Sequence, residues 1–331
     1  MEVIMAVTIR DVARHAGVSV ATVSRYLNHS PLIASESVDK VRRSIEELHY
    51  EPNFLARNML TKQSQSIAFI IDDTSPETFG NDHFLQIQYG AEKALAEHGY
   101  YLMIISLKPR SRFQNLKKAF GEKRADGVII PAQLADGRLL QYLREQDIPY
   151  VIIGRSAASN WVDIDNVIGG KTATEYLLKT GISDICFVGN GKDKVFVQER
   201  SRGYADSMAA AGFPSHLQLD IPSSVENGKA LAAEGNTIYQ GYVVSDNVTA
   251  FGLLQALRDR DICVPEKVQV ISFDDGIVSQ LCSPALTVVD IDVRQLGIQA
   301  ANLLYLQLQS ESPLNQQTLL PVKLIQRGSS R

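Results

Sequence analysis

Apolar residues near the start of the chain recur every three or four positions, which is the spacing of a helix that buries one face. The first set shares one face of a first predicted helix: Ile9, Val12, Ala13 and Ala16. Gly17 ends that helix, because glycine adopts positive φ without strain, and Ser19 is a good N-cap for a second helix that begins at Val20. A second set is expected to face inward from this helix: Val20, Val23 and Leu27.

The opposite face of the second helix is small, polar and basic, with Ala21, Thr22, Ser24, Arg25 and Asn28. A third helix is expected to close a three-helix core through Val38, Val41, Ile45 and Leu48. Two helices joined by a short glycine turn are typical of the helix-turn-helix motif, whose second helix enters the DNA major groove. The alternative is a small bundle that binds nothing, but the agreement of cap, turn, polar face and third helix favours DNA binding.

From residue 66 onward, the pattern changes to short apolar runs that alternate with helical periodicity. The runs predict strands at 66–71, 101–106, 127–131, 150–154, 185–189, 242–245 and 268–273. Helices are predicted between them, for example at 84–97, 168–179, 199–211, 248–259 and 293–308. Strands that alternate with helices form a parallel sheet with helices on both faces. There are too many strands for one compact sheet, so two doubly wound lobes are expected.

Bulk composition restricts the class of protein. A chain of 331 residues with 45% hydrophobic and 21% charged residues is typical of a globular protein of two or three domains. No apolar run approaches the roughly 18 residues of a membrane span, and residues 1–7 lack the basic region and cleavage site of a secretory signal. The three cysteines are too widely spaced for a disulfide framework or a metal site: Cys186, Cys263 and Cys282. We therefore expect a cytoplasmic protein with no membrane association, no cofactor and no metal.

Charge alone does not indicate a DNA-binding protein. Residues 1–62 hold eight Lys/Arg and seven Asp/Glu, a net charge of +1, and the remainder holds 25 and 30, a net charge of −5. Affinity for DNA must therefore come from the placement of a few basic groups and from dimerisation, and it should depend steeply on salt.

The sequence TIRDVARHAGVSVATVSR from Thr8, with HYEPNFLARNMLTKQS from His49, resembles the N-terminus of lactose-repressor (LacI/GalR) family transcription regulators. The later segments DGVIIP, YVIIGR, DNVIGGKTATEYL, ERSRGY, VVSDNVTAFG and VQVISFDD continue the resemblance, which covers residues 7–328. It implies an all-α helix-turn-helix DNA-binding domain followed by an α/β periplasmic-binding-protein-like effector domain of two doubly wound lobes.

The resemblance also implies the domain boundaries. Residues 1–52 would form the DNA-binding domain, 53–64 a hinge helix and linker, and 65–331 the effector-binding and dimerisation domain. The chain would cross between the lobes three times, near 163–165, 291–292 and 321–323. Lobe one would then hold about 65–163 and 292–320, and lobe two about 164–291 and 321–328.

For DNA, the resemblance assigns Val20, Ala21 and Arg25 to base edges, and Arg25 has the geometry to pair with guanine through two hydrogen bonds. It assigns contacts with the phosphate backbone, which fix register without reading sequence, to Thr8, Ser19, Thr22, Ser24, Asn28, Tyr50 and Asn53. Tyr50 could equally be structural and close the small core against Leu48.

The linker 53–61 is too short for a stable isolated helix, since marginal stability begins near ~12–15 residues. Two such segments from a dimer are expected to pair at the operator centre. There the family wedges a leucine into the minor groove, and this sequence has Met59, which is also an acceptable apolar wedge. Arg57 would lie nearby, facing phosphate or the minor groove. The alternative for Met59 is a plain linker residue.

For the effector, the resemblance matches polar residues at predicted strand ends to sugar-binding positions: Arg155, Arg200, Ser245, Asp246 and Asp274, with Asp73 beside them. Guanidinium groups and carboxylates suit vicinal hydroxyls, and Phe196, Phe79 or Trp161 could stack on a sugar ring. Two departures from the family are Gly154, where many relatives have Asp, and Ser245, where many have Asn. For each single residue the alternative is a helix cap or a structural ion pair.

The predicted function is therefore a dimeric repressor of carbohydrate-utilisation genes that binds a pseudo-palindromic operator and responds to a small sugar between its lobes. The segment 72–84 resembles the loop of Gram-positive maltose-operon repressors, which favours maltose, maltodextrin or a related glucoside. No heptad helix follows the last predicted strand, so a dimer is expected rather than a tetramer. The alternatives are a corepressor- or partner-protein-dependent regulator and a solute-binding receptor. An enzyme is disfavoured, because the sequence has no GxSxG, P-loop or HExxH motif.

Overall fold

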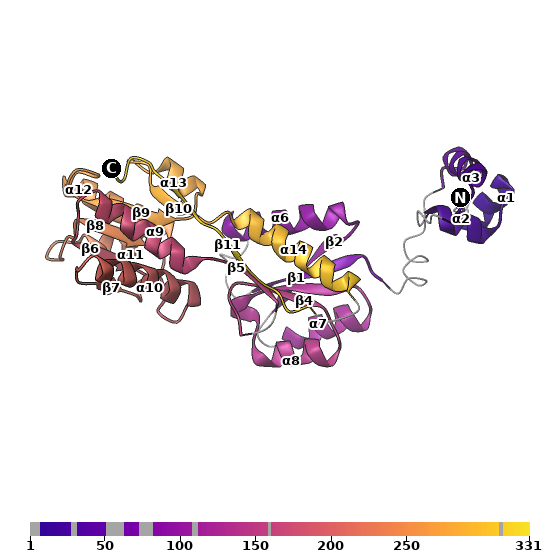
Figure 1. Cartoon of the computed structure of the whole chain (residues 1–331), viewed down its shortest axis with the longest axis horizontal. Helices are drawn as coiled ribbons and strands as arrows, with labels where there is room; N and C mark the ends of the chain where they lie inside the picture. Colours follow the sequence, from indigo (N-terminus) through magenta and orange to yellow (C-terminus); the bar gives the residue numbers. More distant parts are fainter. Residues whose placement is uncertain are drawn as a thin grey trace, which may run out of the picture. The chain divides into compact units, whose positions relative to one another are not determined.

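The computed structural model describes residues 7–27, 32–50, 63–72, 82–107, 112–157, 160–310 and 314–331. The chain divides into two compact units, Met1–Ser64 and Gln65–Arg331 (Figure 1). Within the described part, no helix is both long enough and apolar enough to cross a membrane.

The smaller unit consists of α1 (Ile9–Ala16), α2 (Val20–Leu27) and α3 (Ser35–Glu47). Gly17 ends α1 at φ 68°, as predicted. The Asp11 carboxylate accepts hydrogen bonds from both the backbone N–H (3.0 Å) and the hydroxyl (2.6 Å) of Thr8, which fixes the start of α1. The predicted N-cap of α2 is also confirmed, because the Ser19 hydroxyl oxygen accepts the Thr22 N–H at 3.1 Å.

The core of this unit is small and consists of Val12, Ala13, Ala16, Val23, Val41 and Tyr50. The prediction that Val20 faces inward is wrong, since this side chain is 42% exposed. Val20 occupies the first turn of α2, and the side chains of α1 and α3 close over Val23 in the middle of that helix instead. Ser44 is buried unexpectedly, and its hydroxyl lies 3.1 Å from Nδ1 of His15.

Among the described residues, the larger unit holds two six-stranded sheets, ordered β11-β5-β4-β3-β1-β2 and β12-β10-β9-β8-β6-β7. The first sheet contains β1 (Ser66–Asp72), β2 (Tyr101–Leu107), β3 (Gly127–Pro131), β4 (Tyr150–Ile153), β5 (Trp161–Ile164) and β11 (Gln317–Leu320). The second contains β6 (Ile185–Val188), β7 (His216–Gln218), β8 (Gly241–Val244), β9 (Gln269–Phe273), β10 (Thr287–Asp290) and β12 (Lys323–Ile325). The pairs are parallel except for β10 with β12, so the predicted doubly wound architecture is confirmed.

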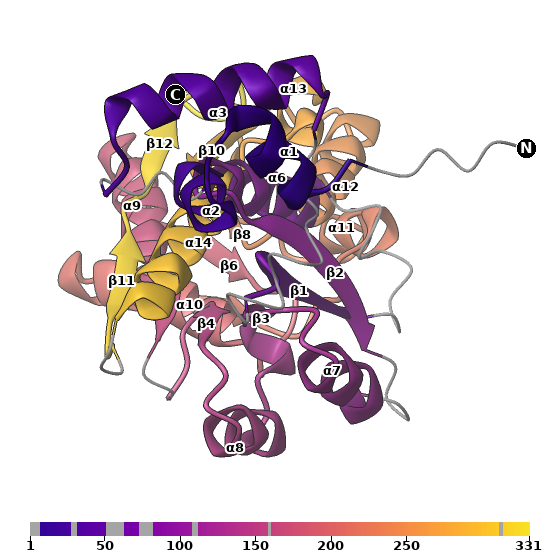
Figure 2. The same cartoon turned by 90° about the vertical axis from the view of Figure 1, so that its right-hand side faces the viewer.

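Helices cover both faces of each sheet (Figures 1 and 2). On the first sheet, α6 (Asp82–Glu97) and α14 (Val293–Gln309) cover one face, and α7 (Arg112–Gly121) and α8 (Gly137–Glu145) cover the other, near the short 3-10 helix η1 (Ala132–Leu134). The second sheet is covered by α9 (Asn166–Lys179) and α10 (Val195–Ala210) on one face. Its other face carries α11 (Val225–Leu231) and α12 (Asn247–Asp259), and α13 (Ile277–Leu281) follows β9. Because both faces are covered, the strands are almost continuously apolar.

The chain passes from one sheet to the other three times, at 165, at 291–292 and at 321–322. One cluster of buried side chains includes Ile71 and Ile164 of the first sheet and Phe273 and Val289 of the second. The two lobes therefore share a hydrophobic core on the side where the crossings lie.

Two glycines allow α9 and α10 to approach closely. A Cβ added to Gly170 would lie 2.0 Å from the carbonyl oxygen of Arg200, and one added to Gly203 would lie 2.0 Å from that of Val167. Backbone therefore packs against backbone, and this contact sets the position of Arg200 relative to α9.

We expect Gly170→Ala to lower the free energy of unfolding by about 2–3 kcal/mol, because the methyl group must push the two helices apart. Urea denaturation of the purified variant measures this. Gly137→Ala at the start of α8 is the matched control, since a Cβ there meets nothing within 4 Å. An equal loss of stability in both variants would contradict the close-packing argument.

Candidate functional site

The outward face of α2 carries mostly small side chains. Val20, Ala21 and Arg25 are exposed, while Thr22 and Ser24 are partly buried. Only Arg25 has a long side chain, so the helix backbone could approach a surface as closely as a groove of DNA requires. One guanidinium then projects from that face, and it provides donors in a fixed fork.

Two hydroxyl groups lie at the N-terminal end of α2. The Ser19 and Thr22 hydroxyls are 2.9 Å apart, beside backbone N–H groups that favour an anion such as phosphate. Thr8 lies at the N-terminus of α1, where its hydroxyl already donates to Asp11. Tyr50 is 7% exposed and belongs to the three-helix core, against which Leu48 packs.

Several predicted site residues lie outside the described part of the chain, and the structure assigns them no position: Asn28, Asn53, Arg57, Met59, Asp73 and Phe79.

An ion pair joins the two lobes. Nε of Arg155, which follows β4 in the first lobe, lies 2.9 Å from Oε1 of Glu199 on α10 in the second. The Arg155 guanidinium also lies 5.4 Å from the ring centre of Trp161. The Arg155 backbone N–H donates to the carboxylate of Asp163 at 2.9 Å. Burial raises the pKa of Glu199, whose side chain is 7% exposed, and the charge of Arg155 opposes that rise.

Arg200 is buried beside this pair. Its placement at a strand end is wrong, because it lies within α10 (Val195–Ala210), in agreement with the helix predicted at 199–211. Its Nε donates to Oδ1 of Asn166 and one terminal nitrogen donates to the carbonyl of Ser245, both at 2.9 Å. Its guanidinium carbon lies 3.9 Å from the ring centre of Phe273 and 5.0 Å from that of Phe196. The guanidinium is thus held by two directional bonds and by the faces of two aromatic rings.

Asp274 makes a second contact between the lobes. It follows β9 with φ 71°, and Oδ2 of its carboxylate lies 3.6 Å from Nδ1 of His83 at the start of α6. Burial raises the pKa of Asp274, but the charge and hydrogen bond of His83 and the charge of Arg200 outweigh burial and hold that pKa below its ordinary value. The Asp274 side chain keeps 28% of its surface exposed, so a ligand could reach it.

Ser245 and Asp246 serve the local structure. The Ser245 hydroxyl oxygen accepts the backbone N–H of Asn190 at 3.0 Å, and Ser245 is 2% exposed. Asp246 caps α12, since its two carboxylate oxygens accept from the backbone N–H and the hydroxyl of Thr249, each at 2.9 Å. It also accepts from Ser223 at 2.7 Å. These contacts match the helix-cap alternative for Asp246.

Sequence reasoning missed four residues of this junction: His83, Asn166, Glu199 and Phe273. Glu199 stands directly before Arg200 in the sequence QERSRGY, and this adjacency was a usable signal. Nothing in the sequence indicated that His83 of one lobe would face Asp274 of the other.

Within the described part of the chain, three buried oxygen atoms near the junction have no hydrogen-bond partner: Oδ1 of Asn190, Oε2 of Glu199 and Oδ1 of Asp274. A buried acceptor without a donor costs about 1–3 kcal/mol. A ligand rich in hydroxyl groups would provide the missing donors. A separate hollow of about 400 Å³ lies elsewhere in the second lobe, and its lining includes Asn227, Asn236 and Tyr239 but none of the predicted site residues.

Comparison with known proteins agrees with this arrangement. Residues 8–53 match the profile of bacterial regulatory proteins of the lacI family, and residues 174–330 match that of the periplasmic binding protein-like domain. The HTH-type transcriptional regulator RegA of Clostridium saccharobutylicum is 30% identical over 340 residues, which covers 98% of this chain and 100% of RegA. The HTH-type transcriptional regulator MalR of Streptococcus pneumoniae is 28% identical, over 88% of this chain and 90% of MalR.

Solved structures also match almost the whole chain. The complex of the transcriptional regulator CelR with cellobiose is 26% identical, with a TM-score of 0.71 over 98% of this chain and 100% of its own. The lac repressor dimer, bound to operator and the anti-inducer ONPF, is 22% identical and has the same fold, with a TM-score of 0.80 over 98% of this chain and 99% of its own.

The buried Glu199 carboxyl leads to a pH-dependent prediction. Because its pKa is raised above the ordinary value of 4.5, the folded protein holds this proton where the unfolded chain has lost it. Glu199 should therefore make the protein less stable as the pH rises from 4.5 through the folded pKa. We expect the curve of unfolding free energy against pH to fall less steeply for Glu199→Gln than for the wild type.

Urea denaturation between pH 4.5 and 7 gives both curves. A constant offset between them reports effects of the substitution that do not depend on protonation, and a difference in slope reports the titration of Glu199 together with its ion pair with Arg155. Parallel curves would show that the pKa of Glu199 does not rise on folding.

Proposed function

Because this chain belongs to the lacI family of bacterial regulatory proteins, we propose that it represses carbohydrate-utilisation genes and responds to a small sugar bound at the junction of its lobes. The observation that carries the proposal is the junction itself. Arg155, Arg200 and Asp274 meet there with acceptor oxygens that lack donors, in the same chain as a helix-turn-helix unit with an exposed reading face.

We assign one function to each of the three predicted segments of the chain. Residues 1–52 bind DNA, 53–64 connect, and 65–331 bind the effector and dimerise. On DNA, Val20, Ala21 and Arg25 contact base edges, while phosphates are held by Thr8, Ser19, Thr22, Ser24, Asn28 and Asn53, with Arg57 and Met59 in the minor groove or beside it. The burial of Tyr50 favours a structural role for that residue. The proposed location of the protein is the cytoplasm, where it would meet DNA.

The larger unit exposes apolar side chains that suit a second copy of the chain. Leu85 and Tyr89 on α6 are 44% and 46% exposed, and Ile277 and Leu281 on α13 are 66% and 77% exposed. Both helices lie along the upper edge of the larger unit in Figure 1. Large apolar side chains exposed to this extent suit contact with another protein surface. A homodimer would place two reading helices on a pseudo-palindromic operator.

The proposed effector is a neutral disaccharide of glucose. CelR, which is 26% identical, was solved with cellobiose, and the resemblance of segment 72–84 favours maltose or maltodextrin. A sugar ring would stack on Phe196, and its hydroxyls would reach Asp274, Arg155 and the free acceptor of Glu199. Ser245 and Asp246 would then act mainly by holding the backbone around Arg200 and α12.

We expect Arg25→Ala to remove most of the preference for operator over scrambled DNA. One Arg–guanine pair contributes about 1–3 kcal/mol of discrimination, and a dimer loses two such pairs. The operator is a duplex selected from a random pool with the wild-type protein, and fluorescence anisotropy at one salt concentration compares it with its scrambled version. The control is Arg42→Ala on α3, whose guanidinium pairs with Asp39, and it should keep the preference. Unchanged discrimination in Arg25→Ala would remove α2 from its reading role.

We expect Asp274→Ala and Arg200→Met to bind the sugar at least tenfold more weakly while still binding operator. Each variant removes a charged hydrogen-bonding group from a shielded site, which is a loss of about 1.5–3 kcal/mol. Calorimetric titration with maltose and with cellobiose measures this, and Lys192→Ala, which breaks an exposed pair with Asp220, is the control. If the wild type binds neither disaccharide, the effector proposal is overturned. If the sugar tightens operator binding, the protein is regulated by a corepressor.

A further inference from the structure

The backbone at Asp274 is held in a strained conformation. Its φ of 71° is in the left-handed region, which a residue with a Cβ adopts only where the surroundings enforce it. Its N–H donates to the carbonyl of Val289 at 3.2 Å, and its own carbonyl accepts from the hydroxyl of Ser279 at 2.8 Å. These bonds fix the backbone on two sides but leave the next residue, Asp275, to be anchored separately.

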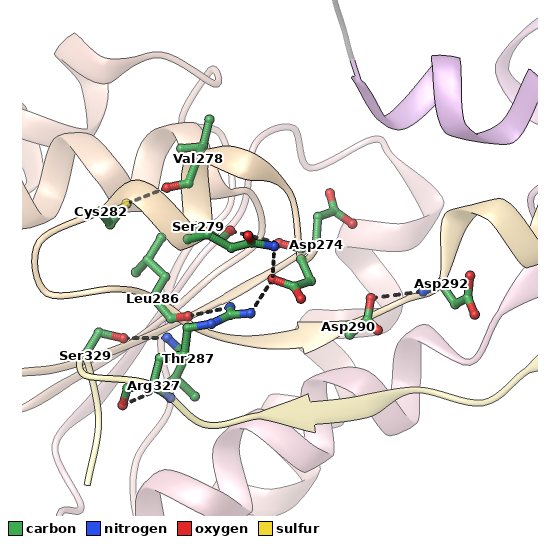
Figure 3. A network of polar contacts seen from close by, with 12 residues as sticks. Asp274, Val278, Ser279, Cys282, Leu286, Thr287, Asp290, Asp292, Arg327 and Ser329 are labelled. Atoms are coloured by element: carbon green, nitrogen blue, oxygen red, sulfur yellow. Dashed lines mark hydrogen bonds and ion pairs between the residues drawn. The ribbon is translucent and has the colours of Figure 1, made fainter. Parts of the chain in front are cut away.

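Arg327 provides that anchor (Figure 3). One terminal nitrogen of its guanidinium lies 2.6 Å from Oδ1 of Asp275, and the other donates to the carbonyl of Leu286 at 3.1 Å. The two charged side chains are 19% and 22% exposed, so water screens this pair only in part. The Arg327 backbone is fixed as well, because its N–H donates to the Thr287 hydroxyl at 2.9 Å.

The segment that carries Arg327 is itself buried against the second sheet. Ser329 is fully buried; its hydroxyl donates to the carbonyl of Val270 at 2.6 Å and accepts the N–H of Thr287 at 2.8 Å. Its carbonyl accepts the N–H of Val270 at 2.9 Å. These bonds do not involve the guanidinium, so the segment should stay in place when the Arg327 side chain is changed.

Arg327 also lies close in sequence to one of the lobe crossings. The chain leaves the first sheet after β11, passes 321–322, forms β12 and reaches Arg327 two residues after Ile325. A displacement of β12 against β10 would therefore move the group that holds Asp275, and with it the strained residue Asp274.

We propose that Arg327 is a positioning residue for the effector: by holding Asp275, it aims the Asp274 carboxylate at the junction of the lobes without touching the ligand. The inference rests on the proposed function in one respect, namely that Asp274 contacts the sugar. Arg327 then takes part in effector binding. A change in the angle between the lobes, transmitted through the last crossing at 321–322, would also change the position of Asp274 relative to the ligand.

The test uses the full-length protein with Arg327→Met, which keeps the length of the side chain but loses its donors, and Asp275→Asn. We expect each variant to bind maltose or cellobiose, whichever the wild type binds, about tenfold more weakly in calorimetry. The double variant should bind about as weakly as the weaker single variant, because each substitution breaks the same Arg327–Asp275 ion pair. Arg327→Lys should recover part of the affinity. Arg260→Met is the matched control, since Arg260 donates to the carbonyls of Ala232 and Ala233 in the same lobe, and it should bind as the wild type does.

A second measurement does not need the sugar. Amide hydrogen exchange should become faster in residues 274–281 of Arg327→Met and stay unchanged in β6 and β8. Exchange that is equally fast across the whole lobe, together with a lower unfolding midpoint, would mean a merely structural role and would overturn the proposal. Wild-type affinity and wild-type exchange in Arg327→Met would overturn it as well. If Asp274→Ala binds sugar normally, the proposed effector site fails, whereas loss of binding in Asp274→Ala but not in Arg327→Met removes only the positioning role.

Discussion

The burial of the Arg200 guanidinium is the constraint on which the arrangement of the second lobe depends. A charged group taken out of water must have its donors satisfied within the protein, or folding becomes unfavourable by several kcal/mol. The close approach of α9 and α10 at Gly170 and Gly203 brings Asn166 within 2.9 Å of this group, and the end of β8 provides the carbonyl of Ser245. The ring of Phe273, at the end of β9, then covers one face of the guanidinium. The packing of α9 against α10, the end of β8 and the ring of Phe273 together satisfy this one buried charge.

Few polar contacts join the two lobes within the described part of the chain. Apart from their shared hydrophobic core, the described residues connect the lobes through two charged contacts, Arg155 with Glu199 and His83 with Asp274. Both contacts include a carboxylate oxygen that is buried without a donor, so neither carboxylate is fully satisfied by the protein. A ligand that provides donors at this junction changes the relative free energy of lobe arrangements, and it can shift them only by its difference in affinity between those arrangements.

The DNA-binding unit is built on a different physical basis. Its core has few side chains, centred on Val12, Val23 and Val41, and a core of this size supplies little stability. Local devices therefore matter more: the Thr8–Asp11 cap, the left-handed Gly17 and the Ser19 cap each fix one end of a short helix. The result is a second helix, α2, whose geometry is set locally and whose outward face carries few large side chains.

Periodicity in the sequence was sufficient to predict the helix-turn-helix, because its caps, turn and apolar face are all local and each has a characteristic residue type. The alternation of strands and helices also predicted two doubly wound lobes, since a parallel sheet needs a helix between its strands. Short strands such as β7, β10 and β11 escaped prediction, because three or four residues carry no clear period. The exposure of Val20 was decided by α1 and α3, which close over Val23 instead. The capping role of Asp246 is local, because its partner Thr249 lies three residues further on, and a helix cap was among the alternatives that the sequence left open. The pairs Arg155–Glu199, His83–Asp274 and Arg327–Asp275 join residues 44, 191 and 52 positions apart in sequence. Such contacts depend on how the chain crosses between sheets, and only the tertiary structure determines which charges meet.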